Sequence, residues 1–267
     1  MIAVIAGTGS LPKQACKSLI EKNKNFFVIS LFPQDNFEQI KEVVQNYTKI
    51  YAQEFFKLGK IQDLLKSNKA THVLFIGKVD KSNLLKNLKF DWLCLKLLAS
   101  LASRSDKTIM EGLINYLKKE NIEVLKQSDI MQSLFVKPGI LIGKITKELQ
   151  ENIDFGMQVA SNISFCDIGQ TILVKDKMII AVEAIEGTDK CIQRGIELGK
   201  NDLIICKTAH KNQNKKYDLP TLGPKTLENI KPGQVKVIAW HADQAFIADQ
   251  EIFVEKAKEL GIVLVAL

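Results

Sequence analysis

The N-terminal stretch MIAVIAGTGSLPKQACKSLIEK, residues 1–22, decides the predicted fold. Its apolar run Met1–Ala6 predicts a buried strand, and the small residues Gly7–Ser10 predict a tight turn. Leu11–Lys22 then predicts an amphipathic helix, with Pro12 tolerated in the first turn. A strand, a glycine turn and a helix in this order are typical of the first unit of a parallel α/β sheet.

The first half of the chain repeats this alternation of strand and helix signals. Each short apolar run is followed by a longer segment whose apolar residues have helical spacing. Strands are predicted at Phe26–Leu31, Lys49–Ala52, Thr71–Ile76 and Asn121–Leu125, and helices at Phe37–Val44, Ile61–Ser67, Lys89–Ser103 and Lys107–Glu120. This order predicts a parallel sheet with helices on both faces.

The pattern changes near residues 127–146, where Pro138, Gly139 and Gly143 predict loops and a short helix. A second α/β unit follows. Its helices are predicted at Lys147–Ile163, Asp189–Leu198, Pro224–Ile230 and Asp249–Glu259, and its strands at Thr171–Lys175, Met178–Glu183, Leu203–Lys207, Val235–Trp240 and Ile262–Leu267. We therefore predict an α/β protein with an N-terminal parallel-sheet domain over residues 1–134 and a distinct C-terminal α/β domain over residues 135–267.

The composition is that of a folded protein with reduced thiols. Apolar residues make up 46% and charged residues 25% of the chain, and no apolar run approaches the ~18–20 residues of a membrane-spanning helix. The first ten residues are too short for a signal peptide and follow no basic segment. The 5 cysteines form no CxxC pair, and only 3 histidines are present, so no zinc-site spacing appears. These features predict a cytoplasmic protein.

The net charge of +7 has two interpretations. A lysine-rich composition of this kind also arises from genome bias without any functional demand. An anionic ligand or an anionic lipid surface is the functional alternative. The sequence contains no motif of an RNA- or DNA-binding protein, so no nucleic-acid partner is predicted.

Two glycine turns follow predicted strands of the first domain. In the turn Gly7–Ser10, the backbone at Gly9 and Ser10 and the start of the next helix favour an anion. The sequence GTGSLP lacks the third glycine of a dinucleotide fingerprint, and no acid ends the second strand, so NAD binding is weakly supported. Lys78 and Val79 follow Gly77 after another strand, and Lys78 can reach a phosphate. A tight structural turn and a solvated lysine are the alternatives.

The segment AVEAIEGTDKCIQRG, residues 181–195, places three acids at a strand-to-helix turn. Glu183, Glu186 and Asp189 surround Gly187 and Thr188, and carboxylates at such a position favour a divalent cation. Capping of the next helix by Thr188 or Asp189 is the alternative, but capping alone does not explain both glutamates.

Three further candidates lie near the ends of predicted strands. Gln170 precedes the strand at Thr171 and can both donate to and accept from a base or ribose. Lys207 ends a buried strand, and Asp218 stands between a lysine-rich loop and the turn at Pro220. A carboxylate beside lysines is ionised, which suits metal binding better than general-acid catalysis. Together these residues predict a phosphorylated ligand, a divalent ion and phosphoanhydride or phosphoester hydrolysis; the GxSxG elbow of serine hydrolases is absent.

The chain resembles the LpxI-type UDP-2,3-diacylglucosamine pyrophosphatases of lipid A biosynthesis. The segments that carry the resemblance run from one end to the other, in order: IAGTGSLP (Ile5–Pro12), FIGKV (Phe75–Val79), DIGQT (Asp167–Thr171), IAVEAIEGTD (Ile180–Asp189) and DLPTLG (Asp218–Gly223). The resemblance implies a Rossmann-like N-terminal domain and a separate C-terminal domain. It also implies a Mg²⁺-dependent enzyme of Gram-negative bacteria that hydrolyses the pyrophosphate bond, with water attacking the α-phosphorus, to lipid X and UMP.

The resemblance assigns roles to the candidates above. Asp218 matches the essential aspartate and is expected to ligate the metal or align water. Residues Gly9, Ser10, Lys78, Val79, Gln170 and Thr188 match positions that contact the nucleotide sugar, and we expect Lys207 to join them. Glu183, Glu186 and Asp189 belong to the same signature and are expected near the metal with Asp218. A non-catalytic nucleotide- or lipid-binding module remains the alternative, since it would keep the turns without needing the acids.

The resemblance also gives the positive charge a use. A substrate with two acyl chains lies in the inner membrane, so peripheral attachment to an anionic surface is expected. The leucine-rich segment Phe90–Leu101 is a candidate for that surface. Packing in a core or at a homodimer interface is the favoured interpretation of the same segment.

Overall fold

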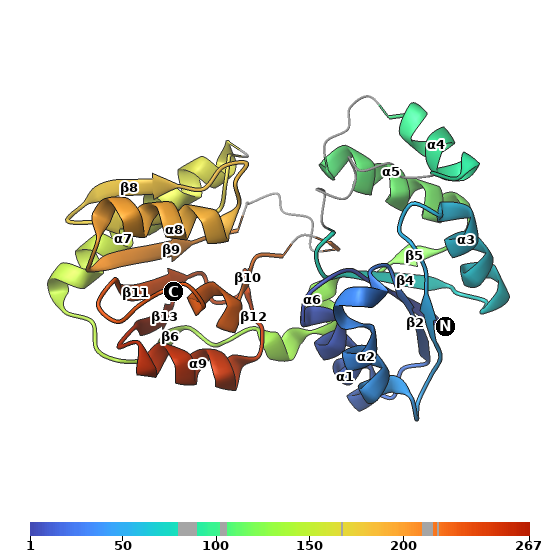
Figure 1. The fold of residues 1–267 in the computed structure, drawn as a ribbon, viewed down its shortest axis with the longest axis horizontal. Coiled ribbons are helices and arrows are strands. Elements are labelled where there is room, and N and C mark those ends of the chain that lie inside the picture. The colour runs from blue at the N-terminus through green and yellow to red at the C-terminus, as the bar shows by residue number, and fades with distance from the viewer. Residues whose placement is uncertain (80–89, 102–105, 167, 210–215, 218) are drawn as a thin grey trace. The chain divides into compact units, whose positions relative to one another are not determined.

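The computed structural model describes residues 1–79, 90–101, 106–166, 168–209, 216–217 and 219–267 (Figure 1). The chain divides into two compact units, Met1–Gln132 with Lys215–Tyr217, and Ser133–Asn214 with Asp218–Leu267. Each unit contains its own sheet, helices and buried core, so the predicted α/β class is confirmed.

The sheet of the first unit has five parallel strands in the order β3-β2-β1-β4-β5. These strands are β1 (Ile2–Ala6), β2 (Phe26–Ser30), β3 (Ile50–Ala52), β4 (His72–Ile76) and β5 (Glu123–Val124). The order reverses between β1 and β4, as in Rossmann-type sheets, where ligands usually bind outside the carboxyl ends of the strands at this point. The turn Gly7–Ser10 follows β1, and the turn Gly77–Val79 follows β4.

Helices cover both faces of this sheet. They are α1 (Leu11–Glu21), α2 (Pro33–Val44), α3 (Leu58–Ser67), α4 (Trp92–Ala99), α5 (Asp106–Lys119) and α6 (Gln127–Ile130). Helices α1, α2 and α6 form one layer and α3 and α5 the other, with α4 outside α3 and α5 (Figure 1). Ala3 and Ile5 of β1 pack in one buried cluster with Ile61 of α3 and Leu117 of α5.

Two helices of this unit differ from the prediction. Helix α2 begins at Pro33, four residues before the predicted start, because proline fits the first turn of a helix. Helix α4 covers only Trp92–Ala99 of the predicted helix over residues 89–103. Of that range, residues 89, 102 and 103 lie outside the described part of the chain.

The main sheet of the second unit is mixed, with the order β6-β13-β11-β9-β7-β8. Its strands are β6 (Gly139–Ile142), β7 (Thr171–Lys175), β8 (Met178–Val182), β9 (Leu203–Lys207), β11 (Val235–Trp240) and β13 (Val263–Ala266). Strands β9, β11 and β13 are parallel, whereas β7 runs antiparallel to β9 and to β8. A separate parallel pair joins β10 (Thr221–Leu222) and β12 (Phe246–Ile247).

Helix α7 (Lys147–Phe165) packs on one face of this sheet, and α8 (Thr188–Gly199) and α9 (Gln250–Glu259) belong to the core on the other. Glycines permit the close approach of two of these helices. A Cβ on Gly156 of α7 would lie 2.4 Å from Cys206 Sγ, and one on Gly195 of α8 would lie 2.5 Å from Leu173 Cδ2. Both helices therefore lie directly against the strands that carry the candidate site.

Two predictions for the second unit need correction, and two short strands were not predicted. The segment that contains Gly139 was expected as a loop but forms the edge strand β6, paired antiparallel to β13. The predicted helix Pro224–Ile230 is a 3₁₀ turn over Pro224–Leu227. Strands β10 and β12 have two residues each, which is too short for a recognisable pattern. No helix in the described part of the chain has the length and apolar character needed to cross a membrane.

Candidate functional site

The turns after β1 and β4 pair with each other through their backbones. Thr8 N donates to Lys78 O at 2.7 Å, and Lys78 N donates to Thr8 O at 3.1 Å. The contact leaves no room for side chains, since a Cβ on Gly7 would lie 2.4 Å from Lys78 O and one on Gly77 would lie 2.7 Å from Thr8 O. The structure thus brings the predicted residues of these two turns together at the carboxyl edge of the first sheet.

Two residues that the sequence prediction missed hold the first turn in place. Gly9 N donates to Asp35 Oδ2 at 2.9 Å, and Asn36 Nδ2 donates to Gly7 O at 2.9 Å and to Gly9 O at 2.8 Å. Asp35 and Asn36 lie in the first turn of α2, just after β2. Their position beside a neighbouring strand end was the signal that could have identified them. Lys78 and Val79 remain exposed next to this turn.

A second group of predicted residues meets at one edge of the second sheet. Because β7 is antiparallel to β8 and β9, its first residue lies level with their last residues: Thr171 pairs with Lys207, and Ile172 with Val182. Gln170 and Glu183 extend this edge, and Gln170 O accepts from Thr208 N at 2.9 Å. This edge therefore contains the first residues of β7 and the last residues of β8 and β9.

Lys207 lies at the centre of this edge. Its side chain is buried, with only 4% of the residue exposed, and its Nζ donates to Thr171 Oγ1 at 3.0 Å and to Thr188 Oγ1 at 2.9 Å. Burying an ammonium is costly unless hydrogen bonds replace its lost hydration, and the two threonine hydroxyls supply part of that replacement. Thr171, which is fully buried, was not predicted as a site residue.

The Glu183 carboxylate accepts hydrogen bonds at the other end of this network. Thr188 Oγ1 donates to Glu183 Oε1 at 2.9 Å, and Gln170 N lies 3.4 Å from Glu183 Oε2. A Cβ on Gly169 would lie 2.0 Å from Glu183 O, so only glycine allows the two segments to approach this closely. The structure thereby brings Gln170, Glu183, Thr188 and Lys207 into one cluster.

The other two predicted acids lie apart from that cluster. Glu186 Oε1 accepts from Arg194 Nη2 at 2.6 Å, and its Oε2 accepts from Ala184 N at 3.2 Å. The hydrogen bond from Arg194 is the main reason that the pKa of Glu186 lies below its usual range. Asp189 is exposed in the first turn of α8.

The three acids therefore do not form a metal site by themselves. Across the described residues, no group of three or more His, Cys, Asp or Glu side chains could hold a metal ion. Two oxygens of Glu183 and two of Glu186 already face hydrogen-bond donors of the protein. The fourth predicted ligand, Asp218, lies outside the described residues.

A histidine next to Lys207 extends the same edge and was not predicted. Trp240 at the end of β11 pairs with Lys207 at the end of β9, so the residues that follow them are neighbours. Thr208 Oγ1 lies 3.0 Å from His241 Nδ1. Burial lowers the pKa of His241, although the nearby Asp243 opposes the shift.

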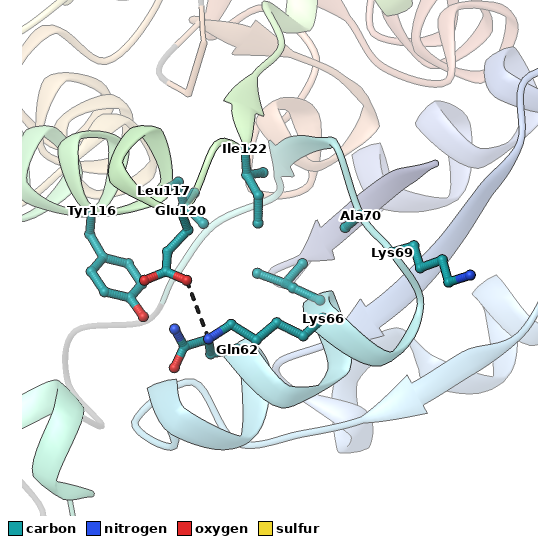
Figure 2. Close-up of a pocket in the computed structure, with 9 residues that line it drawn as sticks. Gln62, Lys66, Lys69, Ala70, Tyr116, Leu117, Glu120 and Ile122 are labelled. Atoms are coloured by element: carbon teal, nitrogen blue, oxygen red, sulfur yellow. Dashed lines mark ion pairs between the residues drawn. The ribbon is translucent and has the colours of Figure 1, made fainter.

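A cavity of the first unit is lined by residues of α3 and α5 and of the segments before β4 and β5 (Figure 2). It has a volume of about 240 Å³ and lies between α3 and α5, with an ion pair of 3.3 Å between Lys66 Nζ and Glu120 Oε2. Ala70 and Ile122, which line it, precede β4 and β5. The cavity is therefore at the amino end of these strands, opposite the carboxyl edge that carries the glycine turns.

Two family models match this chain in succession. The model of the LpxI N-terminal domain matches residues 1–134, and that of the LpxI C-terminal domain matches residues 137–265. A similar curated protein is the UDP-2,3-diacylglucosamine pyrophosphatase LpxI of Caulobacter vibrioides. It is 27% identical over 276 aligned residues, which cover 98% of this chain and 95% of the relative. The similarity thus extends over both units.

Proposed function

Because the chain belongs to the LpxI family, we propose that it hydrolyses the pyrophosphate bond of UDP-2,3-diacylglucosamine. The products are 2,3-diacylglucosamine 1-phosphate, or lipid X, and UMP, and the reaction is a step of lipid A biosynthesis. The observation that carries this proposal is the correspondence of both units, in order and over nearly the whole chain, to a relative named for this activity. A non-catalytic binding module is not favoured by that correspondence.

The two groups of site residues would share the recognition of the substrate. At the second sheet, the buried Lys207 ammonium supplies positive charge beside Thr188, the first residue of α8, and both features favour a phosphate oxygen. Gln170 would contact the nucleotide sugar from the same edge. At the first sheet, we propose that Gly9, Ser10, Lys78 and Val79 contact the substrate from the turns after β1 and β4.

We propose Asp218 as the catalytic carboxylate that aligns the attacking water or ligates a metal. Asp218→Ala is expected to abolish hydrolysis while the far-ultraviolet circular dichroism stays unchanged. Asp154→Ala, at an exposed position on α7, is the matched control and should retain activity. Full turnover by a purified, folded Asp218→Ala variant would remove Asp218 from the mechanism.

A requirement for Mg²⁺ remains a proposal that rests on the family resemblance. The described residues do not assemble a ligand set, so no step of the reaction is assigned to the ion. Of the three acids near Thr188, Glu183 is the one that lies within the cluster of Gln170, Thr188 and Lys207, whereas Glu186 and Asp189 lie outside it. Treatment with EDTA should stop hydrolysis, and Mg²⁺ should restore it; activity that survives EDTA would exclude the requirement.

The direct test incubates the purified protein with UDP-2,3-diacylglucosamine and measures lipid X and UMP by mass spectrometry. Formation of both products in equal amounts supports the proposal, and an unchanged substrate overturns it. Hydrolysis in H₂¹⁸O identifies the phosphorus that water attacks. Attack on the expected α-phosphorus puts the label in UMP, whereas attack on the β-phosphorus puts it in lipid X.

We also propose a cytoplasmic enzyme that binds peripherally to the inner membrane of a Gram-negative bacterium. The proposed substrate carries two acyl chains, so it is presented to the enzyme at a lipid surface. Fractionation of cells should recover part of the protein with the inner membrane and release it at high salt.

A further inference from the structure

Helix α4 exposes an apolar surface that nothing in the described structure covers. None of its eight residues, WLCLKLLA, is buried. Trp92 is 79% exposed and Leu95 is 48% exposed, whereas large apolar side chains normally lose most of their contact with water on folding. Because Trp92, Leu95, Lys96 and Ala99 have the spacing i, i+3, i+4 and i+7, their exposed side chains form one face of the helix, called the outer face below.

The opposite face of α4 attaches the helix to the rest of the unit. Leu93, Cys94, Leu97 and Leu98 are partly buried, and α4 contacts both α3 and α5. Asp91 caps the helix by accepting from Cys94 N at 2.9 Å, and it also accepts from Gly59 N of α3 at 2.7 Å. The outer face is therefore held at a fixed orientation on α3.

Aromatic and basic residues lie next to α4, just before it and at the start of α3. The Phe56 ring lies 6.3 Å from the Phe90 ring and 5.3 Å from the Phe55 ring, measured between centroids. Lys57 Nζ lies 5.5 Å from the centroid of Phe56, and Lys60 and Lys96 are exposed on α3 and α4. Apolar side chains flanked by lysines suit a surface in which an apolar layer lies beneath negatively charged groups.

We propose that the outer face of α4 docks on a membrane surface that contains anionic lipid. Trp92 and Leu95 would enter the boundary between headgroups and acyl chains, while Lys57, Lys60 and Lys96 would remain among the anionic headgroups. A short helix that lies flat on the surface is consistent with the lack of a membrane-spanning helix in the described residues. The inference rests on the proposed function, because a diacylated substrate has to be collected from a lipid surface.

The two tryptophans of the chain permit a direct test. Trp92 is 79% exposed and Trp240 is fully buried, so a change in emission on binding reports on Trp92. With vesicles of phosphatidylglycerol and phosphatidylethanolamine, we expect a blue shift and quenching by brominated acyl chains, and neither effect with pure phosphatidylcholine. The Trp92→Ser/Leu95→Ser double variant should sediment with the anionic vesicles at least about tenfold less than the wild type. Tyr47→Ser, which alters a 66% exposed side chain of the same unit, should sediment like the wild type.

Each outcome decides the inference separately from the proposed function. Equal vesicle binding by the wild type and the double variant, or unchanged Trp92 emission on bound vesicles, overturns it. A wild-type dimer in sedimentation velocity that becomes a monomer in the double variant also overturns it, because the outer face is then an interface between copies. Hydrolysis of substrate dispersed in detergent should be equal in the wild type and the double variant. If neither hydrolyses it, the proposed function fails, whatever the vesicles show.

Discussion

The Lys207 ammonium donates a hydrogen bond to the Thr188 hydroxyl over 2.9 Å, which joins the end of β9 to the first residue of α8. An ammonium has no lone pair, so Thr188 must accept from Lys207 and direct its own proton toward Glu183. The three side chains therefore form one chain of hydrogen bonds that runs from a buried cation to a carboxylate.

Replacing Lys207 should impair the reaction more than the fold. Lys207→Met keeps the length of the side chain and removes its charge. Since a hydrogen bond to a charged group contributes about 1.5–3 kcal/mol, we expect kcat/KM to fall by about 10- to 100-fold. An apolar side chain of similar volume often replaces a buried charge at little cost in stability, so the Tm should change by only a few degrees.

Lys175→Met is the matched control for this prediction. Lys175 ends β7 in the same sheet, and its Nζ donates to Gly199 O at 3.3 Å, away from the cluster. The kcat/KM of the Lys175→Met variant should stay within about twofold of the wild-type value. If both lysine variants lose activity equally, Lys207 has no special role in the reaction.

The contribution of Thr188 to the reaction should depend on its hydroxyl rather than on the shape of its side chain. Thr188→Val preserves the side-chain volume but breaks the hydrogen bonds to both Lys207 and Glu183, so we expect kcat/KM to fall about tenfold or more. Thr188→Ser keeps the hydroxyl and should retain activity within a few-fold. Steady-state kinetics of the wild type and the two variants measure the difference. Equal kcat/KM values for Thr188→Val and Thr188→Ser would show that the hydroxyl is dispensable.

The ion pair of Glu186 and Arg194 should stabilise the protein only when Glu186 is ionised. Arg194 lowers the pKa of Glu186 in the folded state, so the contribution is present above the unfolded pKa of ~4.3 and is lost as the pH falls through the folded pKa. Glu186→Gln should therefore unfold at a lower temperature than the wild type at pH 7, with the gap closing in acid and at high salt. A gap independent of pH would contradict the assignment.

The native protein should present one fast-reacting thiol. Burial raises the pKa of Cys16 and Cys206 to about 12 and is the main reason that the pKa of Cys94 and Cys191 rises to about 11, so little thiolate forms at pH 8. Cys166 is exposed. Ellman's reagent should titrate about one thiol before denaturation and all 5 after it, and Cys166→Ser should abolish the fast reaction. Two or more fast thiols in the wild type would contradict this.

The sequence was sufficient to predict the residues that lie where apolar strands end. Lys207 and Glu183 each follow an unbroken apolar run, and the first charged residue after such a run marks the rim of a sheet. The two α/β units and the parallel sheet of the first were accessible for the same reason, since the alternation of strand and helix is a local pattern.

The contacts that complete the two groups could not be predicted in this way. Thr171 reaches Lys207 only because β7 runs antiparallel to β9, and the direction of pairing depends on tertiary structure. Asp35 reaches Gly9 across 26 positions of sequence. Glu186 lies before α8 and Arg194 lies within it, so the spacing rule of a single helix or strand does not apply to this pair.

The backbone contact between the turns after β1 and β4 has a consequence for motion. At Gly7 and Gly77, the atoms that exclude a side chain belong to the backbone of the opposite turn, so no change of rotamer can relieve the clash. Neither turn can rise without breaking the hydrogen bonds from the other. A ligand that displaces the loop at Gly9 will therefore also displace Lys78. The two turns will move together when a phosphate binds.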